Sequence, residues 1–133
     1  MKFQDVEARL PNGFHDAKLK STSIDYVERV LKIQMELLVG TPDSEDPEEY
    51  RNATLSVTGL LFCAVDPPDV RYPFAEGHSP VWVSGDDQWP KKLDGLLSSL
   101  RANIPGFTYQ RFFAVDWNSF IYVAGRDVEL IWG

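Results

Sequence analysis

A histidine beside an aspartate is the arrangement in this sequence that comes nearest to catalytic chemistry. His15 and Asp16 are adjacent, and an imidazole held by a carboxylate can act as a general base or as a metal ligand. The flanking residues predict a strand over 14–20, however, and neighbours on a strand point to opposite faces, so the two side chains would need a bulge to touch. A structural hydrogen bond beside the Gly13 turn is the favoured interpretation, and catalysis at this pair is the weaker alternative.

Metal and cofactor chemistry has little support in the sequence. A metal site at His15 and Asp16 would need further ligands, for which His78 with Asp86 or Asp87 are the candidates. No H-x-x-x-H, C-x-x-C or D-x-D-x-D-G spacing occurs. The glycine-rich phosphate-binding patterns G-x-G-x-x-G and G-x-x-x-x-G-K are also absent from the sequence. Cys63 lies within an apolar run, where a thiol is more often a small buried side chain than a nucleophile. We therefore predict no metal and no cofactor.

A second group of candidates lies at a predicted reversal near the C-terminal end. Asp116, Trp117 and Asn118 separate two apolar segments that read as strands. An exposed indole at such a turn would indicate a binding partner, whereas a buried and hydrogen-bonded one would be structural. We keep all three residues as binding candidates on that basis.

The negative charge of the chain is concentrated in one segment. The formal net charge is −7, from 13 basic and 20 acidic side chains, which argues against a nucleic acid or an anionic membrane as partner. Residues 40–52 form a proline-containing predicted loop with five of the acids, which are Asp43, Glu45, Asp46, Glu48 and Glu49. A solvated loop is the simpler interpretation. A docking surface for a basic protein partner, with Glu45, Glu48 and Glu49 as contacts, is the sharper one.

In the segments that must position these candidate residues, apolar and polar residues alternate with a period of two. This alternation predicts an antiparallel sheet. Leucine, isoleucine and methionine alternate with polar residues over 31–38, and 53–65 reads as the central strand. Gly125-Arg126 suits a two-residue hairpin loop with glycine first. The predicted strands cover 14–20, 23–27, 31–38, 53–65, 81–83, 107–115, 119–124 and 127–132.

One amphipathic helix is expected at about 90–103, because its leucines recur along one face and Pro105-Gly106 follows. A short helix or ordered arm is expected within 1–10. We thus predict a single α+β domain over 1–133. It would have about seven to eight antiparallel strands, in a sandwich or strongly curled sheet, with the helix covering one face.

The expected compartment is the cytoplasm. No apolar run approaches the ~20 residues of a membrane span, and the first residues lack the apolar core of a secretory signal. A single cysteine also agrees with a reducing environment.

Several short segments, in this order and spacing, resemble a family of small uncharacterised bacterial proteins. They are the GFHDxxL opening at Gly13–Leu19, Asp25-Tyr26, Tyr50-Arg51 with Leu55, Thr58–Leu60, Asp66–Asp69, and the WNSFI segment at Trp117–Ile121. Some families with similar openings resemble immunity proteins of toxin systems. The resemblance implies a protein-binding role and carries over no catalytic residues.

The leading hypothesis is therefore a non-catalytic cytoplasmic domain that binds a basic protein through its acidic loop and the aromatic edge at Trp117. The alternative is a small-molecule binder or hydrolytic enzyme with a pocket near His15, Asp16 and Trp117. A symmetric homodimer built on an exposed edge strand is a third hypothesis.

Overall fold

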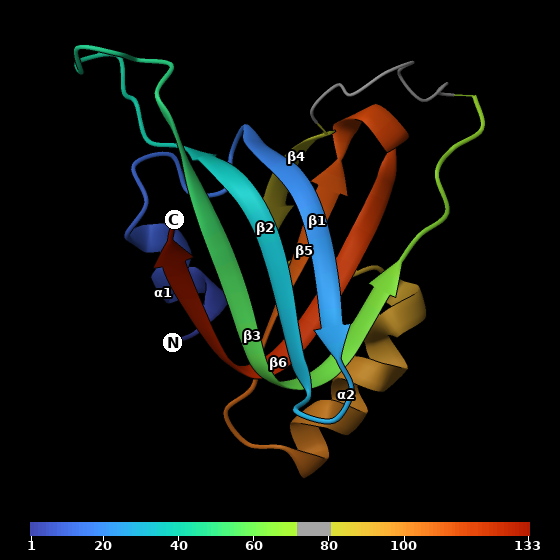
Figure 1. The fold of residues 1–133 in the computed structure, drawn as a ribbon. Helices are drawn as coiled ribbons and strands as arrows, with labels where there is room; N and C mark the ends of the chain where they lie inside the picture. The colour runs from blue at the N-terminus through green and yellow to red at the C-terminus, as the bar shows by residue number, and fades with distance from the viewer. Residues whose placement is uncertain (72–80) are drawn as a thin grey trace.

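The computed structural model describes residues 1–71 and 81–133, and within them six strands close into an antiparallel barrel (Figure 1). The strands are β1 (Ala17–Asp25), β2 (Val30–Leu38), β3 (Tyr50–Val65), β4 (Val81–Asp86), β5 (Thr108–Ala114) and β6 (Ser119–Trp132). Their order around the barrel is β1-β2-β3-β6-β5-β4, and each neighbouring pair is antiparallel.

The predicted α+β sandwich or curled sheet of seven to eight strands is wrong, because two pairs of predicted strands are each one continuous strand. Segments 14–20 and 23–27 merge into β1, which begins only at Ala17 and carries a bulge between Leu19 and Ser21. Segments 119–124 and 127–132 merge into β6. The fold is mostly β, and it closes on itself.

Gly125 lies inside β6 and does not form the hairpin loop predicted at Gly125-Arg126. It pairs with Leu60 of β3 on one side and with Thr108 of β5 on the other. A Cβ atom at this position would lie 2.3 Å from Cγ1 of Val57. Glycine therefore lets two strands approach more closely than any side chain would permit.

The bend of β6 is matched by a bend of β3. Gly59 has a φ of 58°, a left-handed conformation that glycine adopts without strain, and the ladder with β6 shifts register between Leu60 and Phe62. The two longest strands bend together and run from one side of the barrel to the other (Figure 1).

The core fills the inside of the barrel. On β2 the two-residue period holds throughout, because Leu31, Ile33, Met35 and Leu37 are each at most 1% exposed. Helix α1 (Phe3–Ala8) packs onto this core through Phe3 and Val6.

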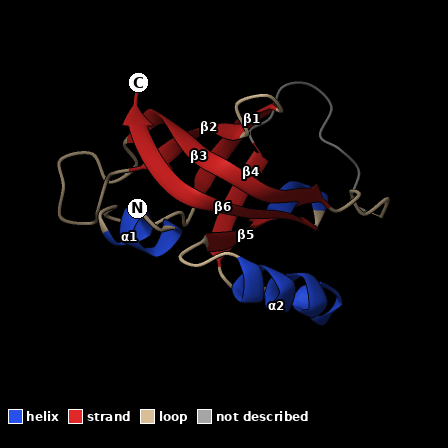
Figure 2. Cartoon of the chain, turned by 90° about the horizontal axis from the view of Figure 1, so that it is seen from below, coloured by secondary structure: helices blue, strands red, loops and turns tan. Residues whose placement is uncertain are grey.

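The predicted helix is present as a 3-10 turn over Lys91–Leu93 that continues into α2 (Asp94–Asn103). It lies outside the barrel (Figure 2). Its apolar face is covered less than predicted, since Leu97 is buried whereas Leu96 and Leu100 are only half-buried. No helix among the described residues is both long and apolar enough to cross a membrane.

A chain of neighbouring aromatic rings lies on the outer side of the sheet near α2. Successive ring centroids are 4.9 to 6.1 Å apart, and the members are Phe62, Trp89, Tyr109, Phe113, Phe120 and Tyr122. The Arg101 guanidinium donates a hydrogen bond to the Tyr109 hydroxyl at 3.1 Å, which links α2 to this layer. Many of the aromatic side chains therefore pack against one another and have a structural role.

We expect Tyr122 to make stability fall at alkaline pH. Burial, followed by its 2.9 Å hydrogen bond to Asp66, raises the pKa of the Tyr122 hydroxyl to about 12. Because folding raises this pKa above the ordinary value of about 10, the stabilisation is complete below pH ~10 and is lost as the pH rises towards 12. Tyrosinate absorbance of the native protein should show a late-ionising phenol that is missing in Tyr122→Phe. If Tyr122→Phe leaves the late part of the native titration unchanged, this assignment is wrong.

Candidate functional site

A groove lies where the start of β1 meets the loop between β2 and β3. It has a volume of about 540 Å³, and its lining comes from the turn before β1, β1 itself, the loop, the ends of β2 and β3, and β4. The lining residues are Asp16, Lys18, Leu38, Pro47, Glu48, Tyr50 and Trp82. We call it the Tyr50–Trp82 groove.

Two aromatic rings and one cation share the wall of the groove. The rings of Tyr50 and Trp82 meet edge to face, with centroids 6.1 Å apart. The Lys18 ammonium lies 3.9 Å from the Tyr50 centroid and 5.1 Å from the Trp82 centroid. Both distances fall within the range of cation–π attraction, so this wall is built to hold a positive charge.

Carboxylates surround the same rings. The Tyr50 hydroxyl donates to the main-chain oxygen of Asp16 at 3.0 Å. Burial, then the negative charges of Asp16, Glu48 and Glu36, raises the pKa of the Tyr50 hydroxyl. The phenol therefore stays neutral, and the negative charges in the groove lining are those of the Asp16 and Glu48 carboxylates.

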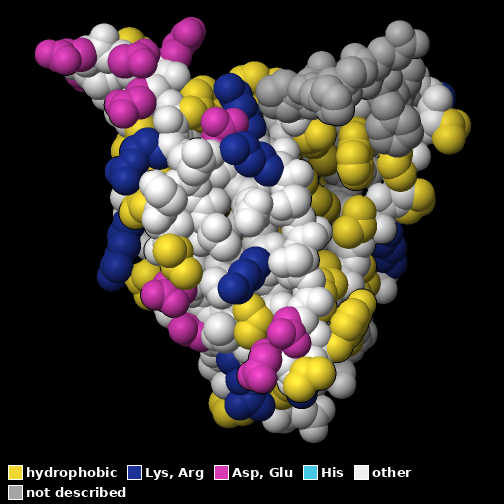
Figure 3. Space-filling model, viewed as in Figure 1, with side chains coloured by type: hydrophobic (Ala, Val, Ile, Leu, Met, Phe, Trp, Pro, Cys, Tyr) yellow, Lys and Arg dark blue, Asp and Glu magenta, His cyan; other side chains and the backbone are white. Residues whose placement is uncertain are grey.

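The loop that carries Glu48 is fixed at its base. The Asn12 amide donates to the main-chain oxygens of Leu38 and Gly40, at 2.9 and 2.8 Å. At Gly40 a Cβ atom would lie 2.4 Å from the main-chain oxygen of Pro47, so the two arms of the loop touch there. The acidic side chains of the loop beyond this contact project outward at the upper left of Figure 3.

The five predicted loop acids are accordingly exposed, and none of them forms an ion pair with any residue that the structure describes. Glu48 lines the groove. Glu45 and Glu49 lie on the same loop outside it.

His15 and Asp16 touch, contrary to the expectation from a strand. His15 Nδ1 lies 3.0 Å from Asp16 Oδ2. The pair precedes β1, and a φ of 57° at Asp16 places its backbone in the left-handed region, which a strand would not allow. The two side chains are 73% and 55% exposed, a solvated setting unlike the enclosed sites that tune a general base. Of the two, Asp16 lines the groove and His15 does not.

The reversal near Trp117 is a 3-10 turn over Val115–Trp117, and its residues have separate roles. Trp117 packs against the core, and Asn118 donates to Asp69 Oδ2 at 3.1 Å. Asp116 Oδ2 accepts from the main-chain N–H of Trp82 at 2.9 Å. Asp116 therefore contacts a strand of the groove, whereas Trp117 and Asn118 are not among the groove residues.

Sequence reasoning missed Lys18, Tyr50 and Trp82 as a group. Alternation did place the Lys18 side chain on the wet face of its strand, and Trp82 stands between two valines that point the other way. Lys18 and Trp82 become neighbours only because β1 pairs with β4 to close the barrel. No local pattern encodes that pairing.

The described residues contain no group of three or more side chains that could hold a metal ion, and His78 lies outside them. No protein-family model, curated protein or solved structure matches this chain.

Proposed function

We propose that the protein is a non-catalytic binding domain whose Tyr50–Trp82 groove receives a basic segment of a partner protein. The observation that carries this proposal is that the aromatic rings of Tyr50 and Trp82 line one groove together with the residues Asp16 and Glu48, whose side chains are carboxylates. An aromatic wall beside fixed negative charge favours a cation that is partly removed from water.

Arginine suits this groove better than lysine. Its planar guanidinium can stack on the Trp82 ring, which is 37% exposed, while its N–H groups meet a carboxylate in two parallel hydrogen bonds. The Lys18 ammonium already lies over both rings, so an incoming cation must share them with it or displace it.

The acidic loop would act at longer range. Its unpaired carboxylates raise the local concentration of a positively charged partner and speed encounter, an effect that salt screens. A basic toxin of the kind that immunity proteins neutralise is one partner with this chemistry.

Neutralising the two groove carboxylates should weaken binding to a basic probe. We expect Asp16→Asn combined with Glu48→Gln to lower the affinity for a labelled, capped arginine–glycine peptide about tenfold at moderate salt. Fluorescence anisotropy measures this change. Glu28→Gln with Glu129→Gln is the matched control, because it removes the same charge from exposed sites outside the groove. Equal losses for both double variants would mean that net charge alone attracts the peptide.

The aromatic wall predicts a second effect that net charge cannot produce. Trp82→Ala should weaken the same peptide about fivefold to tenfold, because cation–π attraction and ring contact are lost. Trp132→Ala is a close control, since Trp132 is also 37% exposed but lies at the end of β6 under Arg51. If the two variants bind the peptide alike, Trp82 has no special part in recognition.

A further inference from the structure

The wall of the barrel has an opening between β1 and the second half of β3. β1 pairs with β4 only over Ala17–Leu19, and β3 pairs with β2 only as far as Thr58. Beyond these points 21–25 of β1 and 61–65 of β3 each have a single strand neighbour among the described residues. Two backbone edges therefore border the opening, at the right of Figure 1.

The apolar interior reaches solvent along this opening. Ile24 pairs with the fully buried Leu31 and shares its inward face, yet Ile24 is 36% exposed. Val65 pairs with Ile121, which is 5% exposed, while Val65 itself is 53% exposed. Apolar side chains accordingly form a strip on this side of the molecule in Figure 3.

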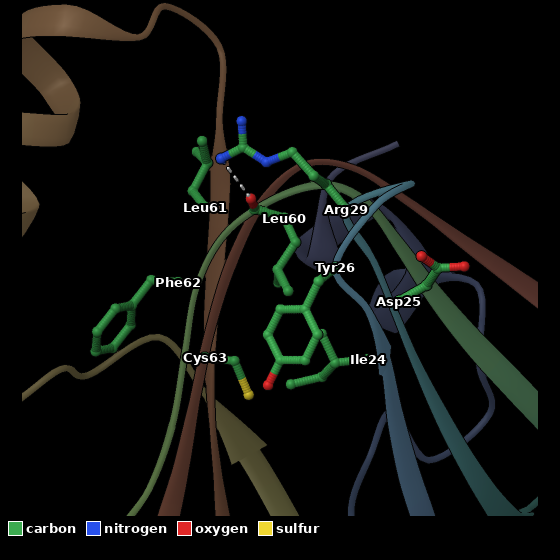
Figure 4. Close-up of a pocket in the computed structure, with 8 residues that line it drawn as sticks. All are labelled: Ile24, Asp25, Tyr26, Arg29, Leu60, Leu61, Phe62 and Cys63. Atoms are coloured by element: carbon green, nitrogen blue, oxygen red, sulfur yellow. Dashed lines mark hydrogen bonds between the residues drawn. The ribbon is translucent and has the colours of Figure 1, made fainter.

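A pocket of about 360 Å³ lies at the hairpin end of the opening, and Figure 4 shows its residues. The Tyr26 ring lies near Ile24 and Cys63, and the lining continues through the segment 60–63 of β3. The Arg29 guanidinium donates to the main-chain oxygen of Leu60 at 3.3 Å and ties the β1–β2 hairpin to β3. The floor of the opening is thus apolar and fixed at one end.

We propose that this opening binds an extended, uncharged segment of another polypeptide, which adds as a strand along the 61–65 edge of β3. Unpaired N–H and C=O groups recur at alternate residues of such an edge, and an extended backbone satisfies them in register. Alternate side chains of the segment would then point into the apolar interior and the pocket. Asp25 and Arg29 contribute opposite charges to the pocket lining, so the pocket favours no net charge, in contrast to the Tyr50–Trp82 groove.

A second copy of this chain is a poorer occupant. Its own free edges belong to strands already held in a barrel, so a second barrel fits less well between the two edges than a single extended segment does. A segment free of other strand pairing fits between them. The 61–65 edge has room for about five residues of such a segment.

The test uses a capped, dye-labelled peptide of alternating valine and threonine, with one lysine and one glutamate at each end so that it stays soluble and carries no net charge. We expect it to bind the whole protein and to slow hydrogen exchange of amides within 61–65 at least about tenfold. Val65→Lys should weaken binding at least about tenfold, because an inward-pointing charge at an edge opposes strand addition. Ile131→Lys is the matched control, since Ile131 is 48% exposed and lies on β6 away from the opening.

Three outcomes would overturn the proposal. The first is a peptide that neither binds nor protects the 61–65 amides of the wild-type protein, a readout independent of any variant. The second is equal binding to Val65→Lys and Ile131→Lys. The third is a dimer of the peptide-free protein that Val65→Lys converts to a monomer, which would make a second copy the occupant. None of these outcomes bears on the Tyr50–Trp82 groove, whose residues lie outside the opening.

Discussion

Gly125→Ala is expected to destabilise the protein by about 3 kcal/mol, because the added methyl group overfills a closed strand contact. Its Cβ would lie 2.3 Å from Cγ1 of Val57, a fully buried side chain on β3, and 3.2 Å from the main-chain oxygen of Thr58. Neither group can move without shifting β3. Urea unfolding followed by circular dichroism measures the change as a lower midpoint.

Gly95→Ala is the control for this substitution. Gly95 lies in α2, and no atom lies within 4 Å of a Cβ placed there. Alanine is favoured over glycine inside a helix by about 0.5–1 kcal/mol, so this variant should be slightly more stable than the wild type. If Gly125→Ala were as harmless as Gly95→Ala, then Gly125 would belong to a loop and the continuous β6 would be wrong.

Phe112→Ala is expected to have the largest effect, a loss of about 3–5 kcal/mol in the free energy of unfolding. Phe112 is 2% exposed, and its ring meets those of Phe3 and Phe14 edge to face, at centroid distances of 6.3 and 5.4 Å. It joins α1 and the turn before β1 to the barrel wall. The deletion would therefore leave a cavity and also loosen the N-terminal segment.

Hydrogen exchange distinguishes a local loosening of the N-terminal segment in Phe112→Ala from destabilisation of the whole barrel. Hydrogen exchange in Phe112→Ala should speed up most in α1 and in the segment around Phe14, before the β2 and β3 amides respond. Uniform acceleration throughout the barrel would show that α1 is not held by the Phe112 ring.

Local patterns in the sequence account for a large part of the fold. The alternation over 31–38 agrees with β2, and the leucine spacing located the helical segment at Lys91–Asn103. These signals are readable because each reflects one buried face of one element. Burial of the leucine face was overestimated, since periodicity shows which side is apolar and not how much of it another element covers.

Where strands turn and which strands pair are harder to predict from the sequence. Glycine first in a Gly-Arg pair fits a hairpin loop, yet at Gly125 the same residue serves a close approach between β6 and β3. The two uses look identical along the chain, because both exploit the missing side chain. Closure of the barrel by β1 and β4 depends on a pairing between residues more than sixty positions apart.

In the candidate site, too, some residues can be found from local sequence signals and others depend on long-range strand pairing. Residue type and the charge of the loop point to Asp16 and Glu48, whereas the turn pattern points to Trp117 and not to Trp82 as the aromatic anchor. Its position at a turn leaves open whether Trp117 is exposed or buried, and the structure shows it half-buried against the core. Trp82 reaches the groove through long-range strand pairing, which no single segment displays.

Backbone amide and indole chemical shifts of the labelled protein, recorded while the arginine–glycine peptide is added, test the central claim most directly. We predict that the largest changes fall on Asp16, Lys18, Glu48, Tyr50 and the Trp82 indole, and that they saturate together. Changes spread evenly over the acidic surface, or centred on Trp132 or the barrel opening, would contradict the claim that the Tyr50–Trp82 groove is the binding site.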